Sequence, residues 1–522
     1  MIREIFRRKC LRLWLCKPEY MERTKWENRF VLLRFWKKNY MMFLKDLKRF
    51  KMERLYDKLK AYSESDFYAF HMPGHKRNKA LLGIELPYDL DITEIDGFDD
   101  LHHADGILKE EQERAARVFG AEESHFLVNG STAGILSAVM GCTHRGDKIL
   151  VARHCHKSIY HAIYMNGLVP RYVYPKFDIS MHMNGEISKE DVAKALAAEP
   201  DIKAVVIVSP NYDGVVSDVK GIAEVAHSYR IPLIVDEAHG PHFGFHPAFP
   251  GRANDLGADV VINSLHKTLP SLTQTAILHI NGKIVNRRRI KKYLDMLQSS
   301  SPSYIFMASL DACVDFVDGK CENAFELYVE RLQKFREELE PLQHLQILRT
   351  EHYDISKVVI STANANITSP ELAERLRKEY HLEMEMTGGT YVLAMTTVAD
   401  TQEGLDRLKA ALLEIDGQLE AKTAVSGSIE ISGELPRLEQ YFTPQEAADR
   451  EEDGEAEEIP WKESEGHISL EYAYLYPPGS PVIVPGERIS REAVELLCYY
   501  ETQNLQIEGI QTEGKIKVWK HE

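Results

Sequence analysis

Cysteine is scarce in this chain, and its N-terminal segment has no long uncharged apolar run. The seven cysteines among 522 residues are odd in number, scattered and without metal-ligand spacing. This usage argues against a disulfide framework and favours thiols kept reduced in a reducing compartment. Charged residues such as Arg34, Lys37 and Lys38 interrupt the N-terminal apolar residues, so none of these runs approaches the ~20 residues that span a bilayer. We therefore expect a cytoplasmic protein without a transmembrane segment, and the length predicts two or three domains.

Charge is distributed unevenly along the chain. Residues 1–50 hold 15 lysines and arginines against five acidic residues, whereas the whole chain has a net charge of −16. One interpretation is a basic amphipathic arm for an anionic membrane or nucleic acid. The other, which we favour, is that translation begins at Met52, because the arm has no heptad or amphipathic pattern. We expect residues 1–51 to be an extension outside the folded domains, and we expect no nucleic-acid partner.

Short apolar strands alternate with helical stretches in the middle of the chain. The expected strands lie near residues 125–129, 148–152, 204–208, 232–236 and 259–263, and helices such as 187–199 and 218–229 lie between them. This alternation is typical of a mostly parallel sheet in an α/β domain. Ligands bind such sheets at the carboxyl ends of the strands, so the side chains that follow the strands are the functional candidates.

Lys267 is the most informative of these side chains. It follows an apolar strand together with Ser264 and His266. Desolvation at a strand end disfavours the ammonium, and the neutral amine is a nucleophile toward carbonyl carbon. That chemistry suits a Schiff base with pyridoxal phosphate, although an ordinary solvated lysine is the alternative for this residue taken alone.

Two neighbouring strand ends carry side chains that suit the same cofactor. Asp236 ends the apolar stretch 231–236, and a carboxylate there could keep a pyridine nitrogen protonated. A metal-binding or helix-capping aspartate is the alternative. His154 or His156 follows the strand 148–152 and could stack on a flat ring, whereas a lone histidine is more often an ordinary surface residue.

A third strand end leads into a helix that could bind phosphate. Gly130 permits a tight turn, and Ser131 and Thr132 bring hydroxyls beside free amides at the positive end of the helix. A plain Ser/Thr cap is the alternative interpretation.

Three histidines, at 239, 242 and 246, have spacings that would put them on one face of a helix, which invites a metal-site interpretation. Pro241, Gly244 and Pro247 argue against a helix there, so we expect no metal.

Together the motifs resemble the major domain of the bacterial ornithine/lysine/arginine decarboxylases, a fold-type-I family of pyridoxal-phosphate enzymes. The matching stretches occur in order over about residues 66–490. They are Phe70–Lys76, Asp91–Glu94, Asp99–His102, Asn129–Thr132, His156–Ser158, Asp236–His239, Ser264–Lys267, Ser301–Tyr304 and Tyr476–Gly479. The resemblance implies a fold-type-I large domain with a mostly parallel sheet and smaller α+β C-terminal domains.

The resemblance also implies roles for individual residues. Lys267 would bind the cofactor covalently, Asp236 would pair with its pyridine nitrogen and His156 would stack on its ring. Further cofactor contacts would come from Ser131, Thr132, Ala238, Ser264, His266 and, from a neighbouring subunit, Ser300. A homodimer would then be the smallest active unit, with the active site at the subunit interface.

Substrate choice follows from the same resemblance. Glu385 matches a family glutamate that faces the distal cation of the substrate, although Glu383 and Glu385 would also suit the solvent face of an alternating strand. His239, a second substrate-side candidate, stands where the long lysine-type enzymes carry tryptophan, as in the short members. We therefore favour arginine over lysine and ornithine, with a polyamine-pathway amine and carbon dioxide as products. Because the long enzymes' N-terminal wing domain is missing, decamers are not expected.

Two other classes of function stay open. An aminotransferase would need an arginine that clamps the substrate carboxylate, for which Arg349 and Arg375 are the small-domain candidates. A non-enzymatic binding protein is the less favoured class.

The rest of the chain predicts two smaller domains. We assign residues 52–340 to the large domain, 341–420 to a small α+β domain and 421–522 to a C-terminal domain. The expected elements are helix 323–340, strand 354–361, helix 369–380, strands 382–386 and 390–396, and helix 401–415. Gln445–Glu465 contains ten acidic residues, which predicts an exposed helix or linker outside the core.

Overall fold

The computed structural model describes residues 53–178, 183–421, 435–475, 479–502, 505 and 507–520. The basic segment 1–51, Met52 and the residues Tyr476–Pro478 lie outside these ranges, so the hypotheses about them stay predictions. The described residues from Leu55 onward form one compact unit.

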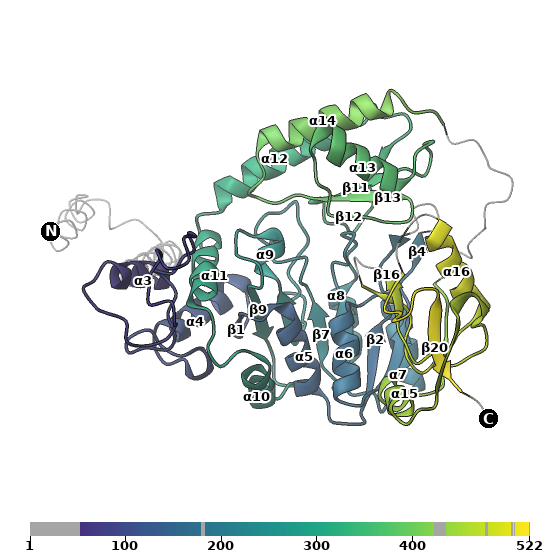
Figure 1. The fold of residues 1–522 in the computed structure, drawn as a ribbon, viewed down its shortest axis with the longest axis horizontal. Helices are drawn as coiled ribbons and strands as arrows, with labels where there is room; N and C mark the ends of the chain where they lie inside the picture. The colour runs from purple at the N-terminus through teal and green to yellow at the C-terminus, as the bar shows by residue number, and fades with distance from the viewer. Residues whose placement is uncertain are drawn as a thin grey trace, which may run out of the picture. The chain divides into compact units, whose positions relative to one another are not determined.

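A seven-stranded sheet forms the centre of this unit, in the order β1-β9-β8-β7-β6-β2-β3 (Figure 1). Its strands are β1 Glu123–Leu127, β2 Lys148–Ala152, β3 Val169–Val173, β6 Val205–Val208, β7 Leu233–Asp236, β8 Val260–Asn263 and β9 Ala276–Ile280. Only β9 runs antiparallel to its neighbours, so β1 points the same way as β8. The mostly parallel sheet and its five expected strands are confirmed, and β3 and β9 were not predicted.

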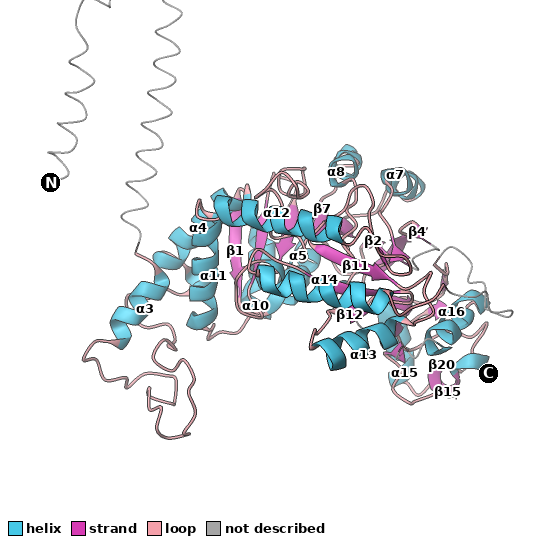
Figure 2. Ribbon diagram, turned by 90° about the horizontal axis from the view of Figure 1, so that it is seen from above, coloured by secondary structure: helices cyan, strands magenta, loops and turns pink. Residues whose placement is uncertain are grey.

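Helices cover both faces of the sheet, and the chain order explains how. α5 (Gly130–Cys142) and α6 (Lys157–Met165) connect strands on the way out to β3, whereas α7 (Lys189–Ala198) and α8 (Val219–Ser228) connect strands on the way back. Right-handed crossovers therefore put the two pairs on opposite faces, and α7 and α8 lie together on the side away from α5 (Figure 2). Buried valine, isoleucine and leucine side chains fill both interfaces.

A second group of helices packs around the β1 edge and leads to the small domain. These elements are α3 Leu55–Ser63, η2 Leu101–His103, α4 Ile107–Phe119, α9 Leu265–Thr268, α10 Arg287–Leu297, α11 Tyr304–Val317 and α12 Glu322–Glu338. Apart from this group, β4 Phe177–Asp178 pairs antiparallel with β5 Met183–Asn184. One hydrophobic cluster joins α11 and α12 to the small domain. No helix in the described ranges is long and apolar enough to cross a membrane.

A four-stranded antiparallel sheet, β10-β11-β13-β12, lies above the edge of the large sheet where α9 is found (Figure 1). Its elements are β10 Gln346–Ile347, β11 Lys357–Ser361, α13 Ser369–Tyr380, β12 Met386–Thr387, β13 Tyr391–Met395 and α14 Gln402–Asp416. The expected helices are confirmed. Two strand predictions begin too early. The predicted strand 382–386 shares only Met386 with β12, and β11 starts at Lys357 because Asp354 accepts a hydrogen bond from the Ser356 amide in a turn.

The last part of the chain forms small antiparallel sheets around one helix. Its elements are β14 Glu439–Gln440, α15 Pro444–Glu452, β15 Ala456–Pro460, η3 Trp461–Glu463, β16 Ala473–Leu475, β17 Pro481–Ile483, β18 Glu487–Arg488, α16 Arg491–Thr502, β19 Ile507–Glu508 and β20 Lys515–Trp519. The prediction of an exposed helix or linker for Gln445–Glu465 is therefore wrong in its second half. β15 pairs with β20 near the end of the chain, and Trp461 directly after β15 is buried, so a partner strand distant in sequence decides the structure here.

Candidate active site

Lys267 lies on the one-turn helix α9, directly after β8, in a partly buried position. Burial lowers the pKa of its amine, and the negative charges of Asp236 and Glu385 act in the opposite direction. Its Nζ lies 2.8 Å from Nε2 of His239. A lysine in this environment loses its proton more readily than a surface lysine and can act as a nucleophile.

His239 is buried and lies between two lysines. Its Nδ1 lies 3.0 Å from Nζ of Lys357, the first residue of β11, whose side chain is also buried. Burial and the two positive charges hold the pKa of His239 well below its usual range. We call Lys267, His239 and Lys357 the lysine–histidine row.

Asp236 ends β7 and is buried near Lys267. Its Oδ1 accepts a hydrogen bond of 3.1 Å from the amide of Ala238. Burial raises the pKa of the carboxyl group, while the charge of Lys267 lowers it. No ion pair in the described residues engages this carboxylate directly, which leaves it able to pair with a cationic ring nitrogen.

His156 and His154 follow β2 in different environments. His156 is the N-cap residue of α6, and its Nδ1 accepts from the Ser158 amide at 3.2 Å, which fixes the orientation of the ring. Burial and the charge of Lys267 lower the pKa of His156 to about 4, so its flat ring is neutral at physiological pH. His154 is buried instead, and its backbone oxygen accepts from Ser480. Of the two, only His156 has Lys267 among the charges that shift its pKa.

Among the described residues, the first turn of α5 has no side-chain cap, and the Gly130 amide donates to the Gln274 backbone oxygen at 2.9 Å. Gly130 adopts φ +72°, as the tight turn requires, and Asn129 occupies the capping position. Within the described residues no side chain caps this helix, so the interpretation of Ser131 or Thr132 as a plain cap is wrong. Uncapped amides at the positive end of a helix form an anion site.

Ser264 and His266 approach from the end of β8. The Ser264 hydroxyl oxygen is buried and has no hydrogen-bond partner in the described part of the chain. His266 Nδ1 lies 2.8 Å from the backbone oxygen of Thr275. A buried unsatisfied hydroxyl is costly, and a phosphate oxygen would satisfy it.

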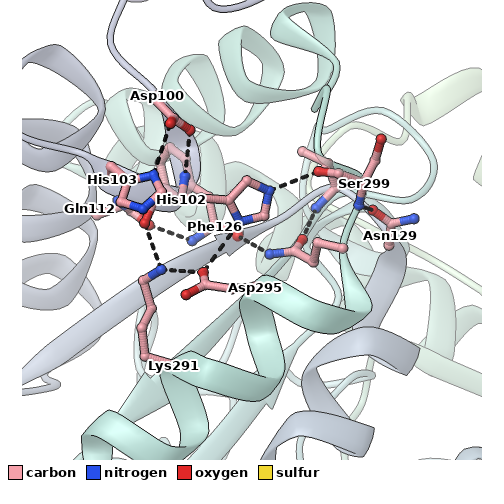
Figure 3. A network of polar contacts seen from close by, with 11 residues as sticks. Asp100, His102, His103, Gln112, Phe126, Asn129, Lys291, Asp295 and Ser299 are labelled. Carbon is pink, nitrogen blue, oxygen red and sulfur yellow. Dashed lines mark hydrogen bonds and ion pairs between the residues drawn. The ribbon is translucent and has the colours of Figure 1, made fainter.

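A polar network holds the loop 298–301 beside the first turn of α5 (Figure 3). The side chain of Asn129 accepts a hydrogen bond from the Ser299 amide at 3.1 Å, and Nε2 of His102 lies 2.8 Å from the Ser299 backbone oxygen. Asp295 and Lys291 hold His102 from the other side, and Lys291 donates to its backbone oxygen at 2.8 Å. Ser300 is exposed on this loop.

Glu385 lies directly before β12 and accepts a hydrogen bond from the hydroxyl of Tyr212. The Tyr212 ring centroid is 4.5 Å from that of His239 and 6.0 Å from Nζ of Lys267. Glu383 and Glu385 are both exposed, which agrees with the solvent-face interpretation. The negative charge of Glu385 also acts to raise the pKa of Lys267.

Two residues at this site, Tyr212 and Lys357, were not predicted from the sequence. Tyr212 lies in the loop that follows β6, so the rule that identified the other strand-end residues would also have found it. Lys357 is a lone charge in an apolar strand of the other domain, and no local pattern indicates what it faces.

The histidines proposed and rejected as a metal site have separate partners. His242 contacts Thr268 at 3.0 Å and Asp354 at 3.2 Å, and His246 contacts Glu326 at 3.1 Å. The segment between β7 and β8 contains no helix, as its prolines and glycines predicted.

The residues present fit pyridoxal phosphate. Uncapped amides of α5 and the unsatisfied Ser264 hydroxyl suit the phosphate, the buried Asp236 suits the ring nitrogen, and Lys267 suits the aldehyde. The fold is that of the fold-type-I class of pyridoxal-phosphate enzymes, and this set of groups suits their cofactor.

Comparisons with known proteins give the family. The family model for the Orn/Lys/Arg decarboxylase major domain matches residues 53–421, and that for the C-terminal domain matches residues 433–514. The chain is 33% identical over 471 residues to an arginine decarboxylase of Bacillus subtilis, covering 87% of this chain and 95% of the relative. It is 25% identical to the lysine decarboxylase LdcA of Pseudomonas aeruginosa, over 83% and 73% of the two chains. The chain belongs to the Orn/Lys/Arg decarboxylase family.

A solved structure shares the fold. The lysine decarboxylase LdcF of Francisella novicida superposes with a TM-score of 0.76 at 20% sequence identity, over 92% of this chain and 84% of that chain. The predicted fold class is therefore confirmed.

Proposed function

We propose that this chain is a pyridoxal-phosphate-dependent decarboxylase of basic amino acids, with arginine as the preferred substrate. The observation that carries the proposal is the convergence of Lys267, Asp236 and the uncapped start of α5 at one sheet edge, below Glu385 of the small domain. Family membership supports the reaction class, and relatives named arginine decarboxylase at 31–33% identity support arginine.

Each residue then has a defined task. When bound, pyridoxal phosphate supplies an electron-accepting ring joined to the substrate amine. The lowered pKa of Lys267 provides the free amine that binds the cofactor covalently and releases it to substrate. Asp236 supplies the buried negative charge that favours a protonated ring nitrogen, and the neutral His156 supplies a flat surface for stacking.

The phosphate end of the site holds the cofactor in register. Ser131 and Thr132 lie in the first turn of α5, and Ser264 and His266 lie at the end of β8. Ala238 orients the Asp236 carboxylate through its amide. We assign all of these residues to cofactor binding.

Glu385 recognises the distal cation of the substrate. The Tyr212 hydroxyl fixes one carboxylate oxygen, and the exposed position of Glu385 leaves the group open to an incoming cation. A guanidinium can pair with a carboxylate in a bidentate manner, which an ammonium cannot. This difference favours arginine over lysine and ornithine.

Assembly as a homodimer is part of the proposal. The long loop after α3 extends away from the domain in Figure 2 and exposes a set of large apolar side chains: Phe67, Tyr68, Phe70, Met72, Leu81, Leu82, Ile84 and Leu86. Phe70 is 90% exposed. An apolar segment of this kind marks a protein interface, and the exposed Ser300 is then available to a second copy of the chain.

An aminotransferase is the rival function. Its carboxylate clamp would need an arginine at the site, but Arg349 pairs with Glu340 at 2.9 Å and Arg375 hydrogen-bonds to Gln418 at 2.6 Å, both on the surface of the small domain. These contacts favour the decarboxylase, whose products would be carbon dioxide and a precursor of polyamines, made in the cytoplasm.

The test is release of carbon dioxide from arginine, lysine and ornithine by the holoenzyme, compared at equal concentration. We expect arginine to have the highest kcat/KM. Transfer of the amino group to an oxo acid without release of carbon dioxide would contradict the proposed function. A higher kcat/KM for lysine would contradict only the choice of arginine.

A further inference from the structure

Lys357 has no task in the function proposed above, although its side chain is fully buried at the site. It begins β11 in the small domain, and its Nζ lies 3.0 Å from Nδ1 of His239. On the opposite side of the same imidazole, Nε2 lies 2.8 Å from Nζ of Lys267. Burial of an ammonium is strongly unfavourable without compensation, so this position needs a physical explanation.

The surrounding backbone is shaped to admit this side chain. Gly214 adopts φ +105°, and a Cβ atom there would lie 2.7 Å from Cγ of Lys357. Only glycine adopts this conformation without strain, and only glycine leaves the room. The Tyr353 hydroxyl donates to the Lys357 backbone oxygen at 2.8 Å, which fixes the start of the strand.

The charges that face Lys357 keep it protonated at neutral pH. Burial lowers the pKa of its amine to about 8, with Asp354, Glu385 and Asp213 acting against burial and Lys267 acting with it. Asp354 is shared with His242 at 3.2 Å, and the Tyr391 hydroxyl donates to Asp213 at 2.5 Å. The ammonium therefore predominates at pH 7.

The protonation states of these groups decide the tautomer of His239. An ammonium only donates hydrogen bonds, whereas a neutral imidazole has one N–H and one accepting nitrogen. His239 is neutral because its pKa is held well below the usual range. If Lys357 donates to Nδ1, the imidazole proton must lie on Nε2, which faces Lys267.

We propose that Lys357 is a positioning residue that holds the proton of His239 on Nε2 and replaces that proton through Nδ1 during turnover. The inference rests on the proposed function. When the bond to the carboxylate breaks and carbon dioxide leaves, the α-carbon retains the electron pair and needs one proton. His239 gives it the Nε2 proton while Nδ1 accepts one from the Lys357 ammonium, so the imidazole stays neutral. Water then supplies a proton to Nε2 as Nδ1 returns its proton to the Lys357 amine, which restores the starting tautomer.

The first test is the tautomer itself, in wild-type holoenzyme with ¹⁵N-labelled histidine. We expect the His239 resonances at pH 7 to show the proton on Nε2, and to change as Lys357 loses its proton near pH 8. A proton on Nδ1 at pH 7 would overturn the proposal. This measurement needs no substrate, so it stands apart from the proposed function.

The second test is Lys357→Met, which removes the charge and retains most of the side-chain volume. We expect kcat to fall by about 10²-fold with KM little changed, because general-acid catalysis contributes on that order. The loss of activity near pH 8 in the wild-type profile should also disappear. An unchanged kcat, or a loss confined to KM, would contradict a positioning role.

Two further variants separate this role from simple packing. Tyr353→Phe loosens the start of β11 without touching the amine and should keep the wild-type pH profile. In a protein that already carries His239→Gln, adding Lys357→Met should change kcat very little, because the two residues act in one path. Full additivity of the two losses would show that Lys357 does not act through His239. Failure of the wild-type enzyme to release carbon dioxide would sink the proposed function and leave the tautomer result intact.

Discussion

Two buried charge clusters lie at the carboxyl edge of the large sheet, and they differ in whether their charges are balanced. Arg153, directly after β2, forms a two-pronged pair with Glu487 of the C-terminal region, with N–O distances of 2.7 and 2.8 Å. Glu487 also accepts from the Val484 amide, and Arg153 also donates to the Val482 backbone oxygen. Every charge in this cluster has a partner within the protein.

The lysine–histidine row is different, because it brings two basic amines to one neutral imidazole. Asp236 nearby has no direct ion pair within the described residues, and Ser264 has an unsatisfied hydroxyl. A buried ion pair whose two charges compensate each other holds two segments together. A buried cluster whose charges are not compensated within the protein is a candidate ligand site. Burial of charge alone therefore does not identify a functional site. Buried charge that the protein leaves partly uncompensated is the more informative sign.

Loss of the central amine should have the largest effect. Lys267→Ala should lower kcat by on the order of 10³-fold or more, because the covalent nucleophile is removed. Lys176→Ala, which alters a surface lysine paired with Glu186, is the matched control. Turnover of Lys267→Ala within tenfold of wild type would contradict the assignment.

Breaking the balanced pair should mainly reduce stability. Arg153→Met leaves Glu487 buried and uncompensated, and we expect a loss of about 3–5 kcal/mol in the free energy of unfolding. Denaturant titration measures it. The double variant with Glu487→Met should recover much of the loss, whereas an exposed pair would show little change in either variant.

Asp236→Asn should produce the opposite pattern. Asparagine retains the shape but cannot balance a cationic ring nitrogen, so kcat should fall by about 10²-fold. Burial raises the pKa of this carboxyl, which means that its charge is costly in the fold, so stability should stay equal or rise. Reduced stability with full activity would contradict the distinction between the two clusters.

The smallest expected effect is on the pH dependence of stability, and it comes from a buried histidine away from both clusters. His279 is buried on β9, its Nδ1 lies 2.7 Å from Ser124 Oγ, and burial lowers its pKa to about 3. The unfolded state then binds more protons than the folded state below pH ~6.5, so stability is lost as the pH falls toward 3. His279→Gln should reduce the loss between pH 7 and pH 5 by about 2 kcal/mol. An identical pH dependence in both proteins would contradict this.

Local patterns predicted much of the fold, because strand ends in a parallel sheet meet at one edge. Lys267, Asp236 and His156 were identified in this way, and all three lie there. β9 was missed because only the one-turn helix α9 separates it from β8, so the regular alternation of strand and helix ends there.

Contacts between domains could not be predicted in the same way. Lys357 acquires its surroundings only when β11 lies over the large sheet, and the pairing of Glu385 with Tyr212 joins residues 173 positions apart. The acidic segment 445–465 was misjudged for a similar reason, because the strand β15 exists only through its pairing with β20 near the end of the chain.

Borohydride reduction of the holoenzyme, followed by peptide mapping, measures directly which lysine binds the cofactor. Reduction makes the bond between a lysine and the cofactor permanent. We expect a single pyridoxyl label on the peptide that contains Lys267. A label on Lys357 or on any other lysine, or no label at all, would contradict it.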